Sequence, residues 1–243
     1  LNLRLKSILE HAIRYKPPKG QDILGIAYQL IRSDYEQSVL GAYFTKSDLV
    51  SFCMDAVEIF IELAAKKNYI DIDLDELYLN PNFRILDPTC GSGSFLTGFV
   101  RRAIEYGVKE QFKAEDVVEK LRYKIHGIDV DPLAVLVARA ELFMMMTDYL
   151  PPPFEVNVYW ADALKLAHYV SPGRCKTILE FLVERIEEFI PELKAPMKEL
   201  NREVEKAADI IRGGVDLIIG NPPWGRRVEV KKRLREALEK LRV

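Results

Sequence analysis

The sequence predicts an α/β protein with a doubly wound, mostly parallel sheet. Apolar segments of strand length alternate along the chain with segments of helical period, a pattern typical of parallel sheets covered by helices. The 243 residues are 49% hydrophobic, which is enough for the full core of one large domain. No apolar run approaches the roughly 20 residues that a membrane span needs. We therefore expect one large α/β domain with a small helical annex.

The elements are expected in an order that builds such a sheet. Helical patterns fill residues 1–16 and 21–37, and a third helix is expected from Thr45 to about Lys67. This third helix is apolar on nearly every side, which predicts that it is largely buried. Thr45 and Asp48 resemble a capping box at its start.

Four strands should follow, joined by helices. Right-handed crossovers between parallel strands would arrange them as half of a doubly wound sheet. The expected strands are 83–87, 123–129, 156–160 and 215–219. The expected helices are 94–106, 114–121, 132 to about 146, and one or two within 176–211, broken near Pro191 and Pro196.

These elements divide the chain into an N-terminal helical region at 1–40 and an α/β domain at 41–243. The sheet of this domain is expected to be truncated after its fourth strand. The long helical insertion at 176–211 is either a partner surface or an elaboration of the core. The chain begins with Leu1 rather than Met, which suggests a trimmed sequence.

Composition and charge narrow the setting of the protein. The cysteines have neither the pairing of a disulfide framework nor the spacing of a zinc site, so we expect a reducing, cytoplasmic location. The net charge is −2, yet residues 226–243 carry eight basic and three acidic side chains, and residues 1–20 carry five and one. Both ends either face phosphates or are solvated helix faces.

A glycine turn separates the first expected strand from its helix. Gly91 and Gly93 let a backbone approach a ligand closely, and the helix that follows offers free N–H groups. Asp87 at the start of the turn would repel a phosphate and favours a cationic, ammonium-bearing ligand instead. Cys90 within the turn is expected to be a small buried residue rather than a nucleophile.

Acidic residues also end the second and third strands. Asp129 is placed to accept both hydroxyls of a ribose, and Val130 could then cover one face of a base. Asp162 either accepts hydrogen bonds from an exocyclic amine or caps the next helix. An ammonium group, a ribose and an aminopurine occur together in S-adenosylmethionine, which these acids predict as the cofactor.

The fourth strand ends in Asn221-Pro222-Pro223-Trp224. The prolines stiffen the turn, which presents an amide, free proline carbonyls and an indole together. Such a group could hold a planar, amine-bearing substrate.

In this combination and order, the motifs resemble those of the N6-adenine DNA methyltransferases of restriction-modification systems. The resemblance is to their gamma arrangement, in which the cofactor region precedes the catalytic motif, and it spans about residues 41–225. It implies a Rossmann-like S-adenosylmethionine-dependent methyltransferase fold, DNA as a partner, and a flipped target adenine. Lys46 departs from the pattern, where Pro often follows the threonine.

The resemblance also implies residue roles. The catalytic residues would be Asn221, Pro222 and Trp224, with Trp224 stacking on the target base. The cofactor would contact Tyr43, Phe44, Thr45, Asp87, Thr89, Gly91, Gly93, Phe95, Asp129, Val130, Asp162, Ala163 and Asn221. No metal ligands are expected.

Two alternatives remain open from the sequence. The same Asn-Pro-Pro-aromatic turn would serve an RNA base amine or a glutamine amide of a protein. The chain could also be a cofactor-binding fragment that does not turn over without a target-recognition domain or subunit.

Overall fold

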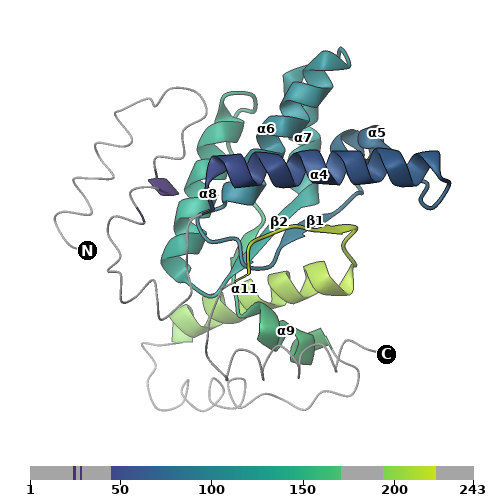
Figure 1. Ribbon diagram of the computed structural model, residues 1–243. Helices are drawn as coiled ribbons and strands as arrows, with labels where there is room; N and C mark the ends of the chain where they lie inside the picture. The colour runs from purple at the N-terminus through teal and green to yellow at the C-terminus, as the bar shows by residue number, and fades with distance from the viewer. Residues whose placement is uncertain (1–23, 26–27, 29–44, 171–193, 223–243) are drawn as a thin grey trace.

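The computed structural model describes residues 24–25, 28, 45–170 and 194–222, shown in colour in Figure 1. Four parallel strands form one sheet in the order β3-β2-β1-β4. The strands are β1 (Ile85–Asp87), β2 (Ile125–Asp129), β3 (Val158–Trp160) and β4 (Leu217–Ile218). This order confirms the doubly wound α/β prediction, because the chain runs outward from β1 to β3 and then returns to the other side of β1. Each strand is shorter than expected at its amino end.

Seven helices are described in these residues. They are α4 (Ser47–Lys66), α5 (Leu74–Leu79), α6 (Ser94–Lys109), α7 (Ala114–Lys124), α8 (Pro132–Thr147), α9 (Ala163–Val170) and α11 (Lys194–Arg212). Of these helices, α5 and α9 are not among those expected from the sequence. Pro196 lies in the first turn of α11, where its missing N–H would be unpaired in any case, so it does not break that helix. None of the described helices is long and apolar enough to cross a membrane.

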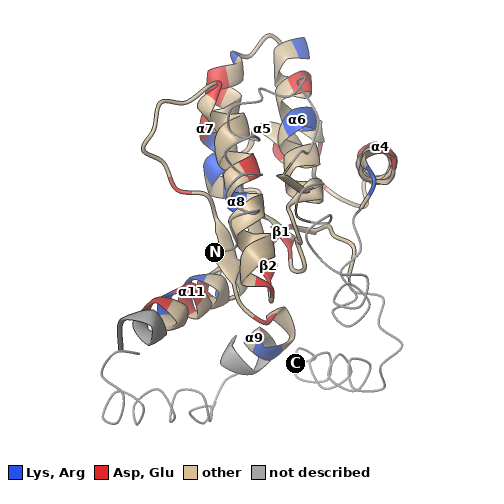
Figure 2. Ribbon diagram, turned by 90° about the vertical axis from the view of Figure 1, so that its left-hand side faces the viewer, with Lys and Arg blue, Asp and Glu red and all other residues tan. Residues whose placement is uncertain are grey.

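The sheet is covered on both faces, as Figures 1 and 2 show. Neighbouring residues of one strand face opposite layers, because side chains alternate along a strand. Ile85 belongs to the core formed with α4 to α8, whereas Leu86 packs with Ala207 and Ala208 of α11. Parallel strands buried on both faces explain why the strand segments read as continuous apolar runs.

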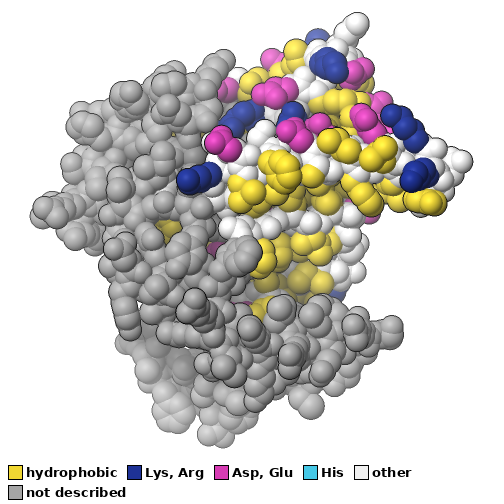
Figure 3. All heavy atoms as spheres, viewed as in Figure 1, with side chains coloured by type: hydrophobic (Ala, Val, Ile, Leu, Met, Phe, Trp, Pro, Cys, Tyr) yellow, Lys and Arg dark blue, Asp and Glu magenta, His cyan; other side chains and the backbone are white. Residues whose placement is uncertain are grey.

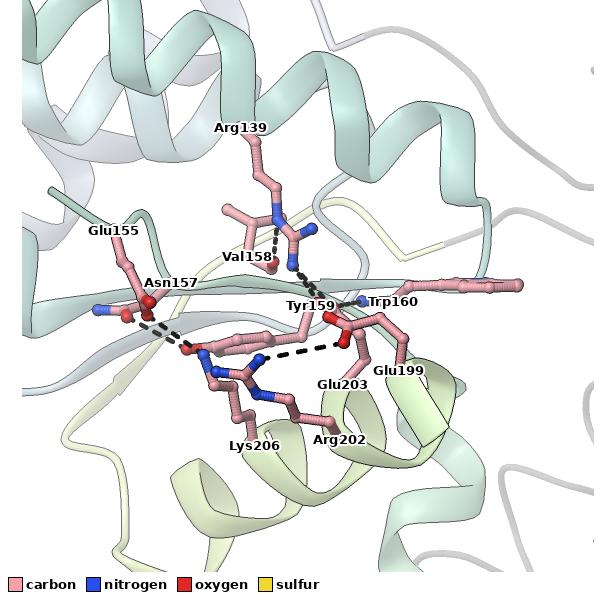
Figure 4. Close-up of polar contacts among 10 residues, drawn as sticks. All are labelled: Arg139, Glu155, Asn157, Val158, Tyr159, Trp160, Glu199, Arg202, Glu203 and Lys206. Carbon is pink, nitrogen blue, oxygen red and sulfur yellow. Dashed lines mark hydrogen bonds and ion pairs between the residues drawn. The ribbon is translucent and has the colours of Figure 1, made fainter. Parts of the chain in front are cut away.

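The outer edge of β3 is closed by an ion pair rather than by another strand (Figure 4). Arg139 of α8 donates through Nε to the Val158 carbonyl at 2.7 Å and through its terminal nitrogen to both oxygens of Glu203, at 2.7 and 2.8 Å. Glu203 of α11 in turn accepts the Trp160 backbone N–H at 3.1 Å. Two polar groups that a strand edge would leave unpaired therefore have partners, which protects the edge.

The N-terminal region contacts α8. The backbone N–H of Leu24 donates to Glu141 at 2.8 Å, and the Tyr28 hydroxyl donates to Asp131. Leu24 and Tyr28 are buried against Ala134 and Val137. The described part of the N-terminal region is thus helical and packs on the sheet domain.

The expectation that α4 is largely buried is wrong. Its inner face is buried at Val50, Met54, Ile61 and Ala64, but Phe52 and Phe60 are 67% and 66% exposed. Figure 3 shows the exposed apolar side chains of α4 gathered on one side of the molecule. Although α4 has apolar residues on nearly every side, only one of its faces packs against the core. Among the described residues, no element covers its other face.

The capping box expected for this helix is also wrong. The helix begins after Lys46, whose side chain makes no capping hydrogen bond. Thr45 makes a different contact, which belongs to the site described next.

Candidate functional site

The site lies where β1 and β4 run side by side, at the point where the strand order reverses. Doubly wound sheets bind ligands in the crevice beyond the carboxyl ends of the strands at such a point. Asp87 ends β1, and the Ile219 N–H donates to the Leu86 carbonyl at 3.0 Å, which carries the Gly220-Asn221 turn past Asp87. Figure 2 shows acidic segments in red at the ends of β1 and β2 and at the start of α9.

Gly220 is required by this arrangement, although the sequence analysis gave it no role. A Cβ at this position would collide with the Asp87 carboxylate. Only glycine lets the Asn221 turn pack directly on the buried acid. A glycine immediately before Asn-Pro-Pro is the signal that could have identified it.

Asp87 is a buried acid with an unusual protonation equilibrium. Its side chain is 1% exposed, and its Oδ1 accepts the Thr89 N–H at 3.0 Å. Burial raises the pKa of Asp87 to about 7; the Thr89 hydrogen bond opposes this shift, and the nearby Asp129 carboxylate adds to it. A cation placed against Asp87 would favour the ionised form and be bound by it.

The glycine turn has two left-handed residues with different surroundings. Gly93, with φ of 91°, precedes α6 and packs so closely on α8 that an added Cβ would lie 3.1 Å from the Ala138 Cβ. At Gly91, with φ of 53°, no atom of the described residues beyond its chain neighbours lies within 4 Å of where its Cβ would be. Gly93 therefore brings two helices together, and Gly91 leaves open space at the turn.

The other residues of the turn point into the protein. Phe95 and Cys90 belong to the core below the sheet edge, and burial raises the pKa of the Cys90 thiol, which disfavours a nucleophilic thiolate. The expectation that Cys90 is buried is confirmed. The Thr89 hydroxyl is buried and has no hydrogen-bond partner among the described residues. Because buried hydroxyls are normally paired, this oxygen is suited to a bound ligand.

Asp129 ties the glycine turn to the end of β2. Its Oδ2 accepts the Gly91 N–H at 2.8 Å and its Oδ1 accepts the Asp131 N–H at 2.9 Å. The Val130 side chain between them is 57% exposed. Asp129 thus fixes both the turn after β1 and the turn after β2.

Asp162 serves as the cap of α9. Its Oδ1 accepts the N–H groups of Leu164 at 3.1 Å and Lys165 at 3.3 Å, and α9 begins at Ala163. Of the two possibilities left open by the sequence, the structure displays the helix cap. Asp162 nevertheless lies at the same end of the sheet, directly after β3.

Asn221 reaches across the sheet end to the start of α4. Its Nδ2 donates to the Thr45 hydroxyl at 3.2 Å, and Thr45 is buried. Pro222 is exposed. Tyr43, Phe44, Pro223 and Trp224 lie outside the described residues. No group of three or more His, Cys, Asp or Glu side chains suited to a metal ion occurs in the ranges that the structure describes.

The chain matches two family models and two curated relatives. A family model described as N-6 DNA Methylase matches residues 19–179, and one described as Eco57I restriction-modification methylase matches residues 123–242. The adenine-specific methyltransferase PglX of Streptomyces coelicolor is 29% identical, over 64% of this chain and 13% of its own length. A putative type II restriction enzyme and methyltransferase of Methanocaldococcus jannaschii is 26% identical, over 82% of this chain and 21% of its own length. The chain therefore spans a minor part of both relatives.

Two solved structures share the fold. The DrdV–DNA complex superposes with a TM-score of 0.56 at 16% identity, over 88% of this chain and 18% of that one. A nuclease-deletion mutant of the Type ISP restriction-modification enzyme LlaGI, in complex with a DNA substrate mimic, gives 0.59 at 15% identity, over 91% and 16%. At these identities the likeness concerns the fold.

Proposed function

The chain belongs to the N-6 DNA methylase family, and from this premise we propose that it transfers a methyl group from S-adenosylmethionine to the N6 amine of a flipped adenine in DNA, as part of a restriction-modification system. The observation that carries the proposal is that the Gly220-Asn221 turn packs through Gly220 on the buried Asp87 at the reversal point of the sheet, while Asn221 contacts Thr45. A substrate amine held at Asn221 would lie next to a ligand held at the ends of β1 and β2.

The residues at this edge fit S-adenosylmethionine. Within the part of the chain that the structure describes, the space at Gly91 leaves room for a ligand against the turn, and the Thr89 hydroxyl has no hydrogen-bond partner and supplies a buried donor and acceptor. Asp87 and Asp129 supply negative charge toward a ligand that carries a sulfonium and an ammonium group. In this proposal the amino-acid side of the pocket is formed or supported by the residues at the end of β1 and in the glycine turn, namely Asp87, Thr89, Gly91, Gly93 and Phe95.

The adenosine side of the pocket would be formed by the ends of β2 and β3. Asp129 would accept the ribose hydroxyls and Val130 would cover the adenine. Asp162 and Ala163 would meet the adenine amine, with Asp162 keeping its hydrogen bonds to α9. Tyr43, Phe44 and Thr45 would hold the methionine end, together with Asn221.

When bound, S-adenosylmethionine supplies an electrophilic methyl group. The chain's contribution is to hold the attacking amine in line with that group. The hydrogen bond from Asn221 Nδ2 to the Thr45 hydroxyl determines which end of the Asn221 amide faces the substrate. With Nδ2 directed at Thr45, the acceptor oxygen Oδ1 of the same amide points the other way. Oδ1 and the Pro222 carbonyl would accept the two N–H groups of the target amine, and Trp224 would stack on the target base.

DNA as the substrate is supported by the family match and by the names of the two relatives. An adenine N6 inside a duplex is out of reach, so the base would be flipped into the crevice. The reading of a DNA sequence would reside outside the described residues, in a target-recognition domain or subunit. We further propose that residues 1–40 are a helical region that supports the catalytic domain at 41–243, as the Leu24 and Tyr28 contacts with α8 indicate.

The proposal is tested by transfer of a radiolabelled methyl group from S-adenosylmethionine. Duplex DNA, RNA of the same sequence and a glutamine-containing peptide would be compared side by side. We expect label in DNA, recovered as N6-methyladenine after hydrolysis. Label only in RNA or peptide would overturn the assignment of the substrate. Binding of S-adenosylhomocysteine without transfer to any of the three would identify a cofactor-binding fragment that needs a partner.

A further inference from the structure

Trp160 is placed at the proposed adenosine pocket, although the family resemblance assigned it no role. It is the last residue of β3 and pairs in register with Asp129 of β2. The Ala161 N–H donates to the Asp129 carbonyl at 3.0 Å, so the ends of the two strands are joined just beyond this pair. Trp160 is 38% exposed at the edge of the sheet where ligands of this fold bind.

The indole of Trp160 holds the turn that follows β2. Its Nε1–H donates to the Val130 carbonyl at 3.0 Å. Val130 belongs to neither β2 nor α8, so its backbone depends on such contacts for its position. With the Asp129 bonds to Gly91 and Asp131, the turn is held from three sides.

Trp160 is itself fixed from behind. Its backbone N–H is bound by Glu203, which the Arg139 guanidinium holds through two hydrogen bonds. In Figure 4 the indole extends away from the Tyr159 ring and from this ion pair. The fixed backbone and the directed ring together give the Nε1–H one defined target.

We propose that Trp160 is a positioning residue for the adenosine part of the cofactor, which it serves by holding the Val130 backbone so that Asp129 and Val130 receive the ribose and the adenine. This inference rests on the proposed function, because it assumes that S-adenosylmethionine binds at this edge. Tryptophan suits this role because its indole N–H donates a hydrogen bond from a flat, apolar ring, whereas phenylalanine has no donor.

The experiment compares Trp160→Phe with Tyr159→Phe in the full chain. Trp160→Phe keeps an aromatic ring and removes the Nε1–H. Tyr159→Phe is the matched control, because it removes one hydrogen bond of the same strand, from the Tyr159 hydroxyl to Asn157 at 3.2 Å. Calorimetry with S-adenosylhomocysteine should show about fivefold weaker binding for Trp160→Phe, as expected for one lost hydrogen bond. Tyr159→Phe should bind like the unaltered chain.

A second measurement leaves Trp160 intact. The chain has two tryptophans, so Trp224→Phe leaves Trp160 as the sole source of indole fluorescence. The fluorescence emission of Trp160 should change saturably as S-adenosylhomocysteine is added. The dissociation constant from this titration should equal the one found by calorimetry. The inference would be overturned if Trp160→Phe bound S-adenosylhomocysteine as tightly as the unaltered chain. It would also be overturned if the Trp160 emission did not change with a ligand that calorimetry shows to bind. Either result would leave the proposed function standing. Failure of the unaltered chain to bind the ligand would overturn the proposed function as well.

Discussion

The amide nitrogen of Asn221 lies 3.2 Å from the hydroxyl oxygen of Thr45, 176 positions away along the chain. This contact joins the turn after β4 to the start of α4. It closes the site on the side opposite Asp129 and fixes the orientation of the amide.

Replacement of Asn221 by alanine should nearly abolish methyl transfer while leaving cofactor affinity within a few-fold of the unaltered chain. The amide is proposed to act on the target amine, and the main cofactor contacts lie at β1 and β2. Transfer of label to DNA and calorimetry with S-adenosylhomocysteine measure the two effects separately. A collapse of affinity would show that the division of roles between Asn221 and the upstream acids is wrong.

Replacement of Thr45 by valine should lower kcat by about fivefold and also raise the KM for the cofactor, because Thr45 both binds Asn221 and is proposed to hold the methionine end. Valine has nearly the same shape but cannot accept the Asn221 hydrogen bond, and loss of one such bond corresponds to roughly this factor. Thr45→Ser keeps the hydroxyl and should restore most of the rate. A rise in KM with unchanged kcat would instead place Thr45 mainly on the cofactor, as the family resemblance implies.

Replacement of Asp129 by alanine should weaken cofactor binding by at least tenfold. The carboxylate holds both the Gly91 turn and the Asp131 turn, and its proposed contact with the ribose would also be lost. Calorimetry measures the affinity, and thermal unfolding without ligand measures how much of the loss is structural. Asp71→Ala, at an exposed loop position, serves as the control. Affinity equal to that of the unaltered chain would exclude Asp129 from the pocket.

Replacement of Asp162 should separate its two possible roles. Serine retains the ability to cap α9 but is too short to reach a ligand as the aspartate would. We therefore expect Asp162→Ser to keep the unfolding temperature near that of the unaltered chain and to weaken binding of S-adenosylhomocysteine. Asp162→Ala should also lower stability, by about 1 kcal/mol for the lost cap. If serine preserved both properties, Asp162 would be a cap alone.

The ionisation of Asp87 predicts how stability without ligand depends on pH. Its pKa rises from an ordinary value of 3.8 to about 7 on folding, so the folded state binds more protons than the unfolded state between these values. The contribution of Asp87 to stability therefore falls as the pH rises from about 4 to about 7. Asp87→Asn keeps the oxygen that accepts the Thr89 N–H and should gain stability relative to the unaltered chain from pH 5 to pH 8.

Urea unfolding at the two pH values measures this difference, with Asp71→Asn as the exposed control. The variant must be compared with the unaltered chain, because His126 acts in the opposite direction: burial lowers its pKa from 6.5 to about 4. Its unfolded state binds more protons in that range, so the His126 contribution rises with pH and offsets that of Asp87. If the difference in unfolding free energy between Asp87→Asn and the unaltered chain did not depend on pH, Asp87 would not be a buried acid that is partly protonated near neutral pH.

Local patterns of the sequence were sufficient for the parallel sheet, its strand positions and the gathering of Asp87, Asp129 and Asn221 at one edge. The sheet and its strands follow from the alternation of strand and helix segments along the chain. The gathering of the three side chains follows because the carboxyl ends of parallel strands meet at one edge of the sheet. Both inferences need only local residues. The short helices α5 and α9 were missed, since six or eight residues give too few periods for a helical pattern. The exposed face of α4 was missed because an apolar pattern records what a helix could bury and not which neighbours cover it.

The sequence by itself determined the class of fold, the glycine turn and the order of motifs, because each of these is written in neighbouring residues. Only the tertiary structure decided that Thr45 contacts Asn221 rather than capping its own helix, that Gly220 must admit the Asp87 carboxylate, and that Trp160 binds the Val130 carbonyl. These contacts join residues that are remote in sequence. Their geometry depends on how whole elements pack, and no local pattern specifies it.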